Sequence, residues 1–298
     1  MTWGHEGIVA LALNRLLKID YVLAAHGTEV LKGQAWRART RVMRQVFRRA
    51  TRVITNSSFT QQIVVGLDIP RERITVLPPV VDLGPGAGAL AIQEVVAARG
   101  LAGKRVLLTV GRLYPRKGHA DVIRALAFLK DRYPDLIYVV AGTGGPLHAP
   151  VELAALAREC GVANRLHLLG RVSDAELDAL YRLCEIFVLP ARQDGLDVEG
   201  FGIAFVEAGL RERAVIAGRS GAVEESVVDG ETGLLVEPGN VAELVETLAR
   251  LLDDPSLRNR LGRQGLERAR ALFSPASQSE RIRTLIGELG RSQPGASP

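Results

Sequence analysis

Two glutamates, Glu199 and Glu207, stand eight positions apart in DGLDVEGFGIAFVEA, residues 194–208. Two glycines between them disfavour helix, so we expect a helix to begin near residues 201–203 and to run to about Arg213. Glu199 then precedes the helix, and Glu207 lies about one turn inside it. The first turn of a helix offers free N–H groups to phosphate, and flanking carboxylates accept hydrogen bonds from sugar hydroxyls. The stretch therefore predicts a site for a polyhydroxylated ligand that carries a diphosphate.

Each glutamate also has an explanation that involves no ligand. Glu199 would interact favourably with the positive end of the helix dipole, and Glu207 would be an exposed helical charge. Neither explanation accounts for the Gly-x-Gly between them. Glu199 also follows Asp194 and Asp197 in a stretch that has no neutralising base.

Three cationic side chains occur in the segment VGRLYPRKGH, in the loop after a predicted strand. Arg112, Arg116 and Lys117 could clamp a diphosphate there, or they could be the ordinary charges of a surface loop. The next strand ends in AGTGG, residues 141–145, where the backbone is free to approach a ligand. This glycine cluster is not a Walker A loop, and it lacks a full GxGxxG, which argues against a dinucleotide dehydrogenase.

Two further strand ends carry candidate residues. His26 ends the strand YVLAAH and could face a cleft, although a lone histidine after a strand is more often structural. GRVSD, residues 170–174, ends another strand, and its backbone groups could meet a flat base. Ser173, however, is already explained as the cap of the next helix, with Glu176 three residues later as its capping-box partner.

The elements that position these residues alternate between strand and helix. Short apolar runs predict nine strands, at residues 21–26, 52–57, 74–82, 105–111, 137–144, 165–172, 185–191, 214–218 and 233–237. Such a rhythm indicates parallel sheets that are covered on both faces, whose ligands bind beyond the carboxyl ends of the strands. A Gly-rich segment at 84–91 reads as a linker between the third and fourth strands. We therefore expect an α/β protein of two facing, doubly wound domains.

The composition is that of a folded protein with ordinary polarity. The chain has 298 residues, 47% of them apolar and 24% charged, and its net charge is +5. Seven arginines and no acid lie between residues 37 and 52, which suits a phosphate-bearing partner, an anionic membrane surface or simply a solvated helix face. Two widely spaced cysteines fit a reducing compartment and argue against a zinc site. The first residues do not resemble a signal peptide, and no apolar run is long enough to span a membrane.

The motifs of the second series together resemble one family. The chain is similar to the retaining glycosyltransferases of family 4, which have the GT-B fold of two facing Rossmann-like domains. That family includes bacterial mannosyl- and glucosyltransferases of cell-envelope and polysaccharide synthesis. The resemblance covers nearly the whole chain and is specific from residue 105 to 250. It rests on five segments in the family's order: GR-x-x-x-x-KG (Gly111, Arg112, Lys117 and Gly118), AGTG (141–144), LGRVSDAEL (169–177), E-x7-E (Glu199 and Glu207) and DGETGLLVEPGN (229–240).

The resemblance implies roles for the strongest candidates. Arg112 and Lys117 would hold the donor diphosphate and stabilise the leaving nucleoside diphosphate. Glu199 would contact the transferred sugar, and His26 would line the sugar pocket from the other domain. Glu207 would bind the ribose hydroxyls.

Further donor-binding positions follow from the same resemblance. They are the amides of Gly202 and Ile203 at the phosphates, Arg171 and Val172 beside the base, and the strand-end glycines Gly111 and Gly142. The resemblance implies no cofactor and no divalent metal, because the helix start and two cations would neutralise the phosphates. The absence of a DxD motif agrees with that expectation.

The start of the chain departs from the family pattern. The leading strands and the Gly-rich loop after the first strand are missing, which would leave a sheet edge unpaired. An N-terminal truncation explains this best, and a variant whose edge is covered by a partner is an alternative. We expect an incomplete acceptor-side domain (1–84), a donor domain (85–273), and a C-terminal helix that crosses back to the N-terminal domain and ends in a disordered tail (274–298). Two smaller departures are Ser220-Gly221-Ala222 for SGG and Pro79-Val80-Val81-Asp82 for Asn-Gly-Val-Asp.

These expectations combine into one preferred function and two alternatives. The preferred function is a hexosyltransferase that moves a hexose from a donor of the GDP-mannose or UDP-glucose type to a glycan or lipid-linked acceptor with retention of configuration. The first alternative is a non-catalytic nucleotide-sugar-binding module. The second is a sugar-nucleotide 2-epimerase, which the combination of E-x7-E and GR-x-x-x-x-KG disfavours. The expected location is the cytoplasm or the inner face of the membrane, with the basic segment 37–52 on the lipid; nucleic acid is not an expected partner.

Overall fold

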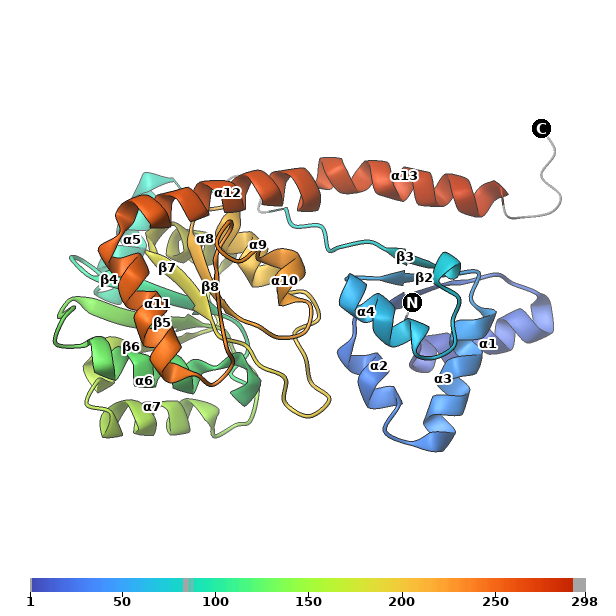
Figure 1. Cartoon of the computed structure of the whole chain (residues 1–298), viewed down its shortest axis with the longest axis horizontal. Helices are drawn as coiled ribbons and strands as arrows, with labels where there is room; N and C mark the ends of the chain where they lie inside the picture. Colours follow the sequence, from blue (N-terminus) through green and yellow to red (C-terminus); the bar gives the residue numbers. More distant parts are fainter. Residues whose placement is uncertain (1, 83–85, 87, 292–298) are drawn as a thin grey trace.

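The computed structural model describes residues 2–82, 86 and 88–291, and these residues form two α/β units (Figure 1). The expected domain boundary between residues 84 and 85 and the expected disordered tail from residue 292 lie outside the described residues. The second unit begins with α5 (Ala89–Arg99), so this helix starts inside the segment 84–91 that the sequence predicts as a linker.

A three-stranded parallel sheet forms the centre of the N-terminal unit, in the order β1-β2-β3. Leu23 of β1 and Val53 of β2 are buried in one apolar core with Met43 and Phe47 from a covering helix. Among the described strands β1 pairs with β2 alone, so β1 is an edge of the sheet. The elements are α1 (His5–Leu17), β1 (Val22–Ala25), α2 (Thr28–Gly33), α3 (Arg37–Arg49), β2 (Arg52–Thr55), α4 (Ser58–Val65), a 3₁₀ turn η1 (Arg71–Arg73) and β3 (Ile74–Val76).

A six-stranded parallel sheet forms the centre of the C-terminal unit, in the order β6-β5-β4-β7-β8-β9. The chain order reverses between β4 and β7, so the loops after these two strands open onto one crevice at the carboxyl edge of the sheet. The loop after β4 carries Arg112 and Lys117, and the loop after β7 carries Glu199. The strands are β4 (Arg105–Val110), β5 (Leu136–Ala141), β6 (Leu166–Gly170), β7 (Ile186–Leu189), β8 (Ala214–Gly218) and β9 (Leu234–Val236).

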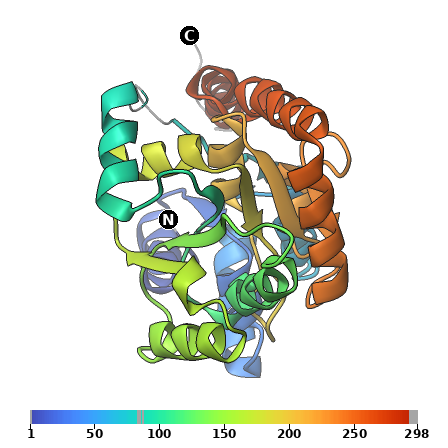
Figure 2. The ribbon, with the colours of Figure 1, turned by 90° about the vertical axis from the view of Figure 1, so that its left-hand side faces the viewer.

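Helices cover both faces of this sheet, as the continuous apolar strands predict (Figure 2). Leu107 and Val188 belong to the core under α6, α7 and α11, whereas Leu108 and Phe187 belong to the core under α5, α8 and α9. Successive residues of a strand point to opposite faces, which divides each strand between the two cores. The helices and turns are η2 (Pro115–Lys117), α6 (His119–Leu129), α7 (Ala149–Glu159), η3 (Ala163–Arg165), α8 (Asp174–Leu183), α9 (Ile203–Gly209), α10 (Val223–Ser226) and α11 (Val241–Asp253).

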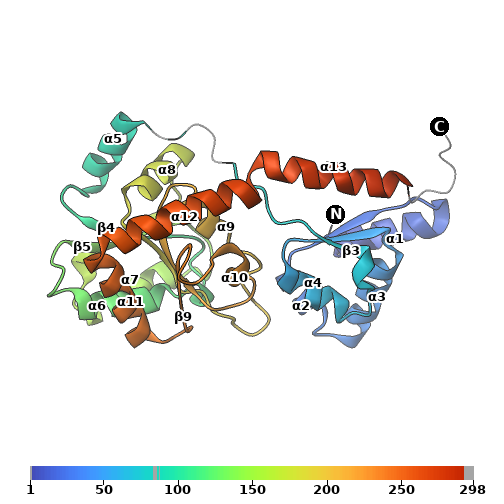
Figure 3. The same cartoon turned by 45° about the horizontal axis from the view of Figure 1, so that its top comes forward.

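The last two helices connect the units. α12 (Pro255–Phe273) packs on the C-terminal unit, and α13 (Pro275–Arg291) continues over the N-terminal one (Figure 3). The amide of Val81 donates a hydrogen bond of 2.9 Å to the carbonyl of Phe273 at the crossing point. Further along, Glu288 pairs with Arg52 of β2 at 3.2 Å. The C-terminal helix thus ties the two units together beside the peptide connection.

The helix after the Gly-x-Gly turn is shorter than the sequence suggests. It begins where expected, at Ile203, after Gly202 with a φ of 84°. It ends at Gly209 and not near Arg213, because the chain then passes through Glu212 in the left-handed region (φ 57°) and enters β8. The prediction of the start was correct and that of the end was wrong.

Candidate functional site

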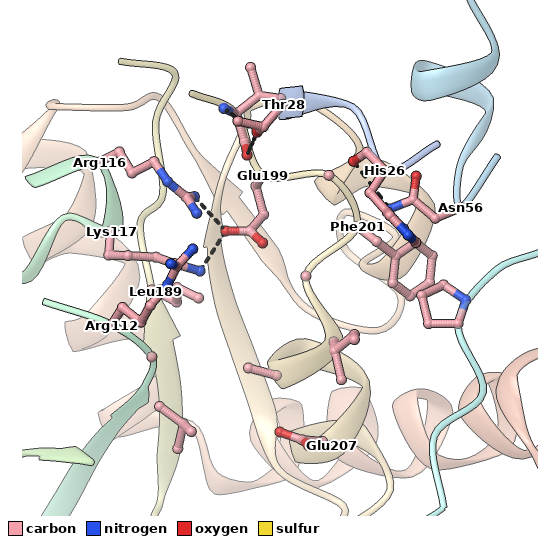
Figure 4. A pocket seen from close by; sticks show the side chains of 18 of the residues that line it. His26, Thr28, Asn56, Arg112, Arg116, Lys117, Leu189, Glu199, Phe201 and Glu207 are labelled. Carbon is pink, nitrogen blue, oxygen red and sulfur yellow. Dashed lines mark hydrogen bonds and ion pairs between the residues drawn. The ribbon is translucent and has the colours of Figure 1, made fainter. Parts of the chain in front are cut away.

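A cavity of about 660 Å³ lies between the two units (Figure 4). The C-terminal unit contributes the loops after β4 and β7 and the start of α9, and the N-terminal unit contributes the loops after β1 and β2. Most of the residues that the sequence singles out line it: His26, Gly111, Arg112, Lys117, Glu199, Gly202, Ile203 and Glu207. The structure therefore brings the two glutamates, the cations and the histidine together, while the role of each remains a prediction.

Glu199 lies at the centre of a charge cluster on the cavity wall. Its Oε2 accepts hydrogen bonds from Nζ of Lys117 at 2.6 Å and from Nη1 of Arg116 at 3.0 Å. The three side chains are nearly buried, each with 11% of its surface exposed. Both cations converge on one oxygen, and no hydrogen bond within the described residues engages Oε1. That oxygen is left to accept a hydrogen bond from a ligand.

Close backbone packing holds this cluster in place. Gly118, which ends the Arg-Lys turn with a φ of 74°, cannot carry a side chain, because a Cβ there would lie 2.5 Å from the carbonyl oxygen of Pro190. A Cβ on Gly221 would lie 2.4 Å from the carbonyl oxygen of Glu199, and that same oxygen accepts the amide of Ala222 at 3.0 Å. Glycine is therefore required at positions 118 and 221, because other backbone segments approach these positions closely.

Burial and charge act in opposite directions on the two central groups. Burial lowers the pKa of Lys117 below its ordinary value, and the neighbouring carboxylate of Glu199 opposes that change. Burial alone would raise the pKa of Glu199, but the charges and hydrogen bonds of Lys117 and Arg116 keep it below its ordinary value. Glu199 therefore stays ionised near neutral pH, and an added anion would favour the charged form of Lys117.

Arg112 contributes a third cation beside this cluster. Its guanidinium stacks over the ring of Tyr114 at 4.9 Å, and in the described part of the chain it forms no ion pair. Its carbonyl oxygen accepts a hydrogen bond of 3.1 Å from Nε2 of His119, a buried histidine whose pKa burial lowers to about 4. Arg112 thus offers an unpaired charge to an anionic ligand from a backbone that a neutral histidine fixes.

The carboxylate of Glu207 accepts a hydrogen bond from a tyrosine outside the cavity. Glu207 is half-buried on α9, and its Oε2 accepts a hydrogen bond of 2.7 Å from the hydroxyl of Tyr181 on α8. The alternative that it is merely an exposed helical charge is therefore wrong. Glu207 and Glu199 line the same cavity at different points, as Figure 4 shows, so they do not form a paired acid and base.

The N-terminal unit supplies the opposite wall of the cavity. His26 lies directly after β1 with an exposed side chain, and its carbonyl accepts a hydrogen bond of 3.4 Å from the amide group of Asn56. Figure 4 shows both residues across the cavity from Lys117 and Glu199. The sequence left open that His26 has a purely structural role, but an exposed side chain that lines the cavity does not fit that interpretation.

The two units touch at the floor of the cavity. A Cβ on Gly200 would lie 2.4 Å from the carbonyl oxygen of His26, so only glycine permits this approach. The hydroxyl of Thr28 donates a hydrogen bond of 3.2 Å to the carbonyl of Val198. Lys32 pairs with Asp197 at 2.8 Å and so provides, from the other unit, a base that the stretch 194–208 itself lacks.

A further contact between the units ends on a helix. The carboxylate of Glu225 on α10 accepts the backbone amides of Ser58 and Phe59 at 2.8 and 2.9 Å. These amides belong to the first turn of α4, whose positive dipole end favours a negative charge. Glu225 therefore caps a helix of the other unit and links the two units.

Three of the expected donor-binding residues do not line this cavity. Gly142 lines another cavity, of about 270 Å³, together with Gly170. It packs against Gly111, because a Cβ on Gly142 would lie 2.1 Å from the carbonyl oxygen of Gly111. Arg171 is exposed beyond β6, and Val172 packs against the core beneath α5 and α8. Their predicted place beside a base remains a prediction.

The sequence alone gave no indication of several residues at the site. Thr28, Asn56 and Tyr181 form no recognisable motif, and the partners of Tyr181 and Glu225 lie on other elements. The one usable signal was position: Asn56 lies at the carboxyl end of the predicted strand 52–57, where open α/β sheets place ligand-binding groups.

Metal-binding groups, membrane-spanning helices and the arginine-rich segment bear on the partners of the chain. Within residues 2–82, 86 and 88–291, no group of three or more His, Cys, Asp or Glu side chains is arranged to hold a metal ion, and independence from metal remains a prediction. In the same ranges no helix has the length and apolarity needed to cross a bilayer. α3 carries the arginine-rich segment, and two of its arginines, Arg44 and Arg48, are paired with Asp68.

Comparison with known protein families identifies both units. The family model described as "Glycosyl transferases group 1" matches residues 93–268, and the model "Glycosyltransferase Family 4" matches residues 1–84. The fold is also that of solved glycosyltransferase structures. Anabaena HepE in complex with UDP and glucose superimposes with a TM-score of 0.83 at 22% identity, over 94% of this chain and 75% of that one.

Curated relatives are similar over most of the chain. The GDP-mannose-dependent alpha-(1-6)-phosphatidylinositol monomannoside mannosyltransferase of Mycobacterium tuberculosis (strain ATCC 25618 / H37Rv) is 34% identical over 261 residues, which are 85% of this chain and 66% of the relative. The D-inositol 3-phosphate glycosyltransferase of Corynebacterium glutamicum (strain R) is 36% identical over 187 residues, 62% of this chain and 43% of the relative. The chain thus spans just under two thirds of the length of the mycobacterial relative.

Proposed function

The chain belongs to the group 1 glycosyltransferase family, and from this premise we propose that it binds a nucleotide sugar between its two units and transfers the hexose to an acceptor hydroxyl. The observation that carries this proposal is the convergence of Arg112, Lys117 and Glu199 in one cavity, with His26 on the facing wall. Cations and a carboxylate with a free oxygen suit a ligand that has both a diphosphate and sugar hydroxyls.

The geometry supports a division of labour in the cavity. Arg112 and Lys117 bind the diphosphate and stabilise the negative charge that grows on it as the bond to the sugar breaks. The free Oε1 of Glu199 accepts a hydrogen bond from the hexose and helps to orient its anomeric carbon. Glu207 accepts hydrogen bonds from the ribose. Departure and attack on the same face would give retention of configuration, which is part of the proposal.

We favour GDP-mannose as the donor and a lipid-linked acceptor. The mycobacterial relative is named as a GDP-mannose-dependent enzyme acting on a phosphatidylinositol mannoside, which supports this choice. UDP-glucose stays the alternative, since the HepE structure contains UDP and glucose. The arginines of α3 would bring the acceptor-side unit to an anionic membrane surface. Sedimentation with anionic and neutral vesicles tests this part, and equal binding to both would contradict it.

One observation favours a second candidate, a module that holds a nucleotide sugar without transferring the hexose. In the described residues the sheet on the acceptor side has three strands against six in the other unit. The sheet on the side that would receive an acceptor is therefore the smaller one, whereas Arg112, Lys117 and Glu207 of the donor-side unit line the cavity.

A two-step experiment tests the proposal. The chain is first titrated calorimetrically with GDP-mannose, UDP-glucose and related nucleotide sugars, and then incubated with lipid and glycan acceptors while released nucleoside diphosphate is measured. Binding together with acceptor-dependent release is the expected result. Binding without release identifies the module, and binding of none of the nucleotide sugars overturns both candidates. Glu207→Ala should abolish most of the affinity at an intact fold.

A further inference from the structure

The carboxylate of Glu207 has a single hydrogen-bond donor in the described part of the chain, the hydroxyl of Tyr181 at 2.7 Å. Tyr181 lies on α8, outside the cavity, and is 2% exposed. Its hydrogen bond engages Oε2, and none within the described residues engages Oε1. One oxygen of Glu207 is therefore fixed from the protein side, and the other remains for whatever occupies the cavity.

The tyrosine itself cannot turn away from this contact. The centroid of its ring lies 5.7 Å from that of Phe187 on β7, and the ring of Phe187 packs edge-on against Phe205 of α9 with a centroid separation of 5.9 Å. Three aromatic rings therefore connect α8, the sheet and α9. Asp178, one turn before Tyr181, forms an ion pair with Arg211, which follows α9. The two helices that carry the donor and the acceptor of the hydrogen bond are thus locked together.

The hydroxyl also keeps its proton. Burial first, and then the negative charge of Glu207, raise the pKa of Tyr181 well above its ordinary value. Tyr181 is therefore a permanent donor to the carboxylate over the whole range in which proteins function. A carboxylate on a helix surface would otherwise rotate freely about its last torsion, which is broad.

We propose that Tyr181 is a positioning residue for ligand binding: it sets the orientation of the Glu207 carboxylate so that its free oxygen faces the ribose hydroxyls of the nucleotide. This inference rests on the proposed function and adds to it the residue that makes the ribose contact directional. Without the hydroxyl, the ligand would have to order the carboxylate at each binding event. The affinity would then fall for nucleotides that have ribose hydroxyls and not for nucleotides that lack them.

The test is a double-mutant cycle between protein and ligand. Wild type and Tyr181→Phe are titrated with GDP and UDP and with their 2′,3′-dideoxy forms. Tyr181→Phe keeps the ring and its packing and removes only the hydroxyl. We expect it to weaken binding of the ribonucleoside diphosphate by roughly tenfold, the effect of one hydrogen bond to a charged group, and binding of the dideoxy form by less than about twofold.

Tyr133→Phe is a matched control. Its hydroxyl also donates to a carboxylate, that of Asp253 at 2.8 Å, in the same unit but away from the cavity. It should lower stability to a similar extent and leave both affinities unchanged. If Tyr181→Phe is less stable than wild type, the shift of its thermal midpoint with each nucleotide measures the same affinities on the folded protein.

The outcomes separate the inference from the function on which it rests. If Tyr181→Phe weakens binding of the ribo and dideoxy forms equally, Tyr181 is merely structural and the inference is overturned. An unchanged affinity of Tyr181→Phe for GDP and UDP also overturns it. If neither GDP nor UDP binds the wild-type protein, the proposed function itself fails.

Discussion

Replacing Glu199 by glutamine isolates the electrostatic role of this residue. The change keeps the size of the side chain, and its remaining oxygen can still accept a hydrogen bond from Lys117, which now lies 2.6 Å from Oε2. Arg112, Arg116 and Lys117 form a group of three cations, of which two pair with this carboxylate. Removing its charge makes the loop more attractive to a diphosphate and removes the contact assigned to the sugar.

Coulomb repulsion between Glu199 and a bound phosphate sets the size of the effect. At an effective dielectric constant of about 20, a phosphate charge roughly 5 Å from Glu199 is repelled by about 3 kcal/mol. Removing this repulsion favours phosphate binding, but part of the favourable effect is lost in the variant. Glu199 raises the pKa of Lys117 against the effect of burial, so without its charge Lys117 would be less fully protonated. We therefore expect GDP or UDP to bind with unchanged to about tenfold higher affinity. Hexose transfer should fall by roughly a hundredfold, as for the loss of a contact made at the reacting centre.

Calorimetric titration of wild type and Glu199→Gln with GDP and UDP, together with initial rates of transfer, measures both effects. Glu185→Gln is the control, since Glu185 pairs with Arg105 and Arg258 away from the cavity. It should change neither affinity nor rate. A loss of nucleoside diphosphate affinity of about tenfold in Glu199→Gln, at unchanged thermal stability, would contradict the assigned role, because it would mean that Glu199 serves mainly to organise the cations.

Three further predictions concern closure and pH. Gly200→Ala places a Cβ 2.4 Å from the carbonyl oxygen of His26 and should push the two units apart. Calorimetry should then show nucleotide-sugar binding weakened by roughly tenfold and GDP or UDP binding nearly unchanged. Equal nucleotide-sugar affinities of wild type and variant would contradict this prediction. The pKa of His119, about 4 in the fold against 6.5 ordinarily, means that stability is complete above pH 6.5 and falls by about 3 kcal/mol as the pH drops to 4. Urea unfolding of wild type and His119→Gln across this range should show that loss only in wild type, and identical pH profiles would argue against it. Because the pKa of Lys117 is lowered, the affinity for nucleoside diphosphates should decline as the pH rises toward 10.5. Lys117→Met should bind nucleoside diphosphates weakly at every pH and show no such decline. A parallel decline in the variant would mean that another group causes the pH dependence.

Much of the C-terminal unit could be predicted from residue patterns. The apolar runs at 105–111 and 185–191 contain β4 and β7, and the rule for open α/β sheets then places Arg112, Lys117 and Glu199 around one crevice. The start of α9 followed from Gly202, which takes a backbone conformation that other residues avoid. These features are local, so the sequence carries them directly.

The contacts between the units could not be predicted in this way. Glu225 caps α4 from a distance of more than 160 residues, and Lys32 neutralises Asp197 across the cavity floor. Which charges pair depends on how two separate sheets dock, and no periodicity or spacing records that. Tyr181 illustrates the same limit within one unit, since an apolar helix position gives no sign that its hydroxyl meets Glu207.

A crystal structure of the chain with GDP or UDP would show whether the cavity between the units is the donor site. If this assignment is correct, the diphosphate lies within hydrogen-bonding distance of Arg112 and Lys117, and the ribose hydroxyls contact the free oxygen of Glu207. A nucleotide bound elsewhere, for example in the separate cavity of about 530 Å³ beside α6 and α7, would contradict it.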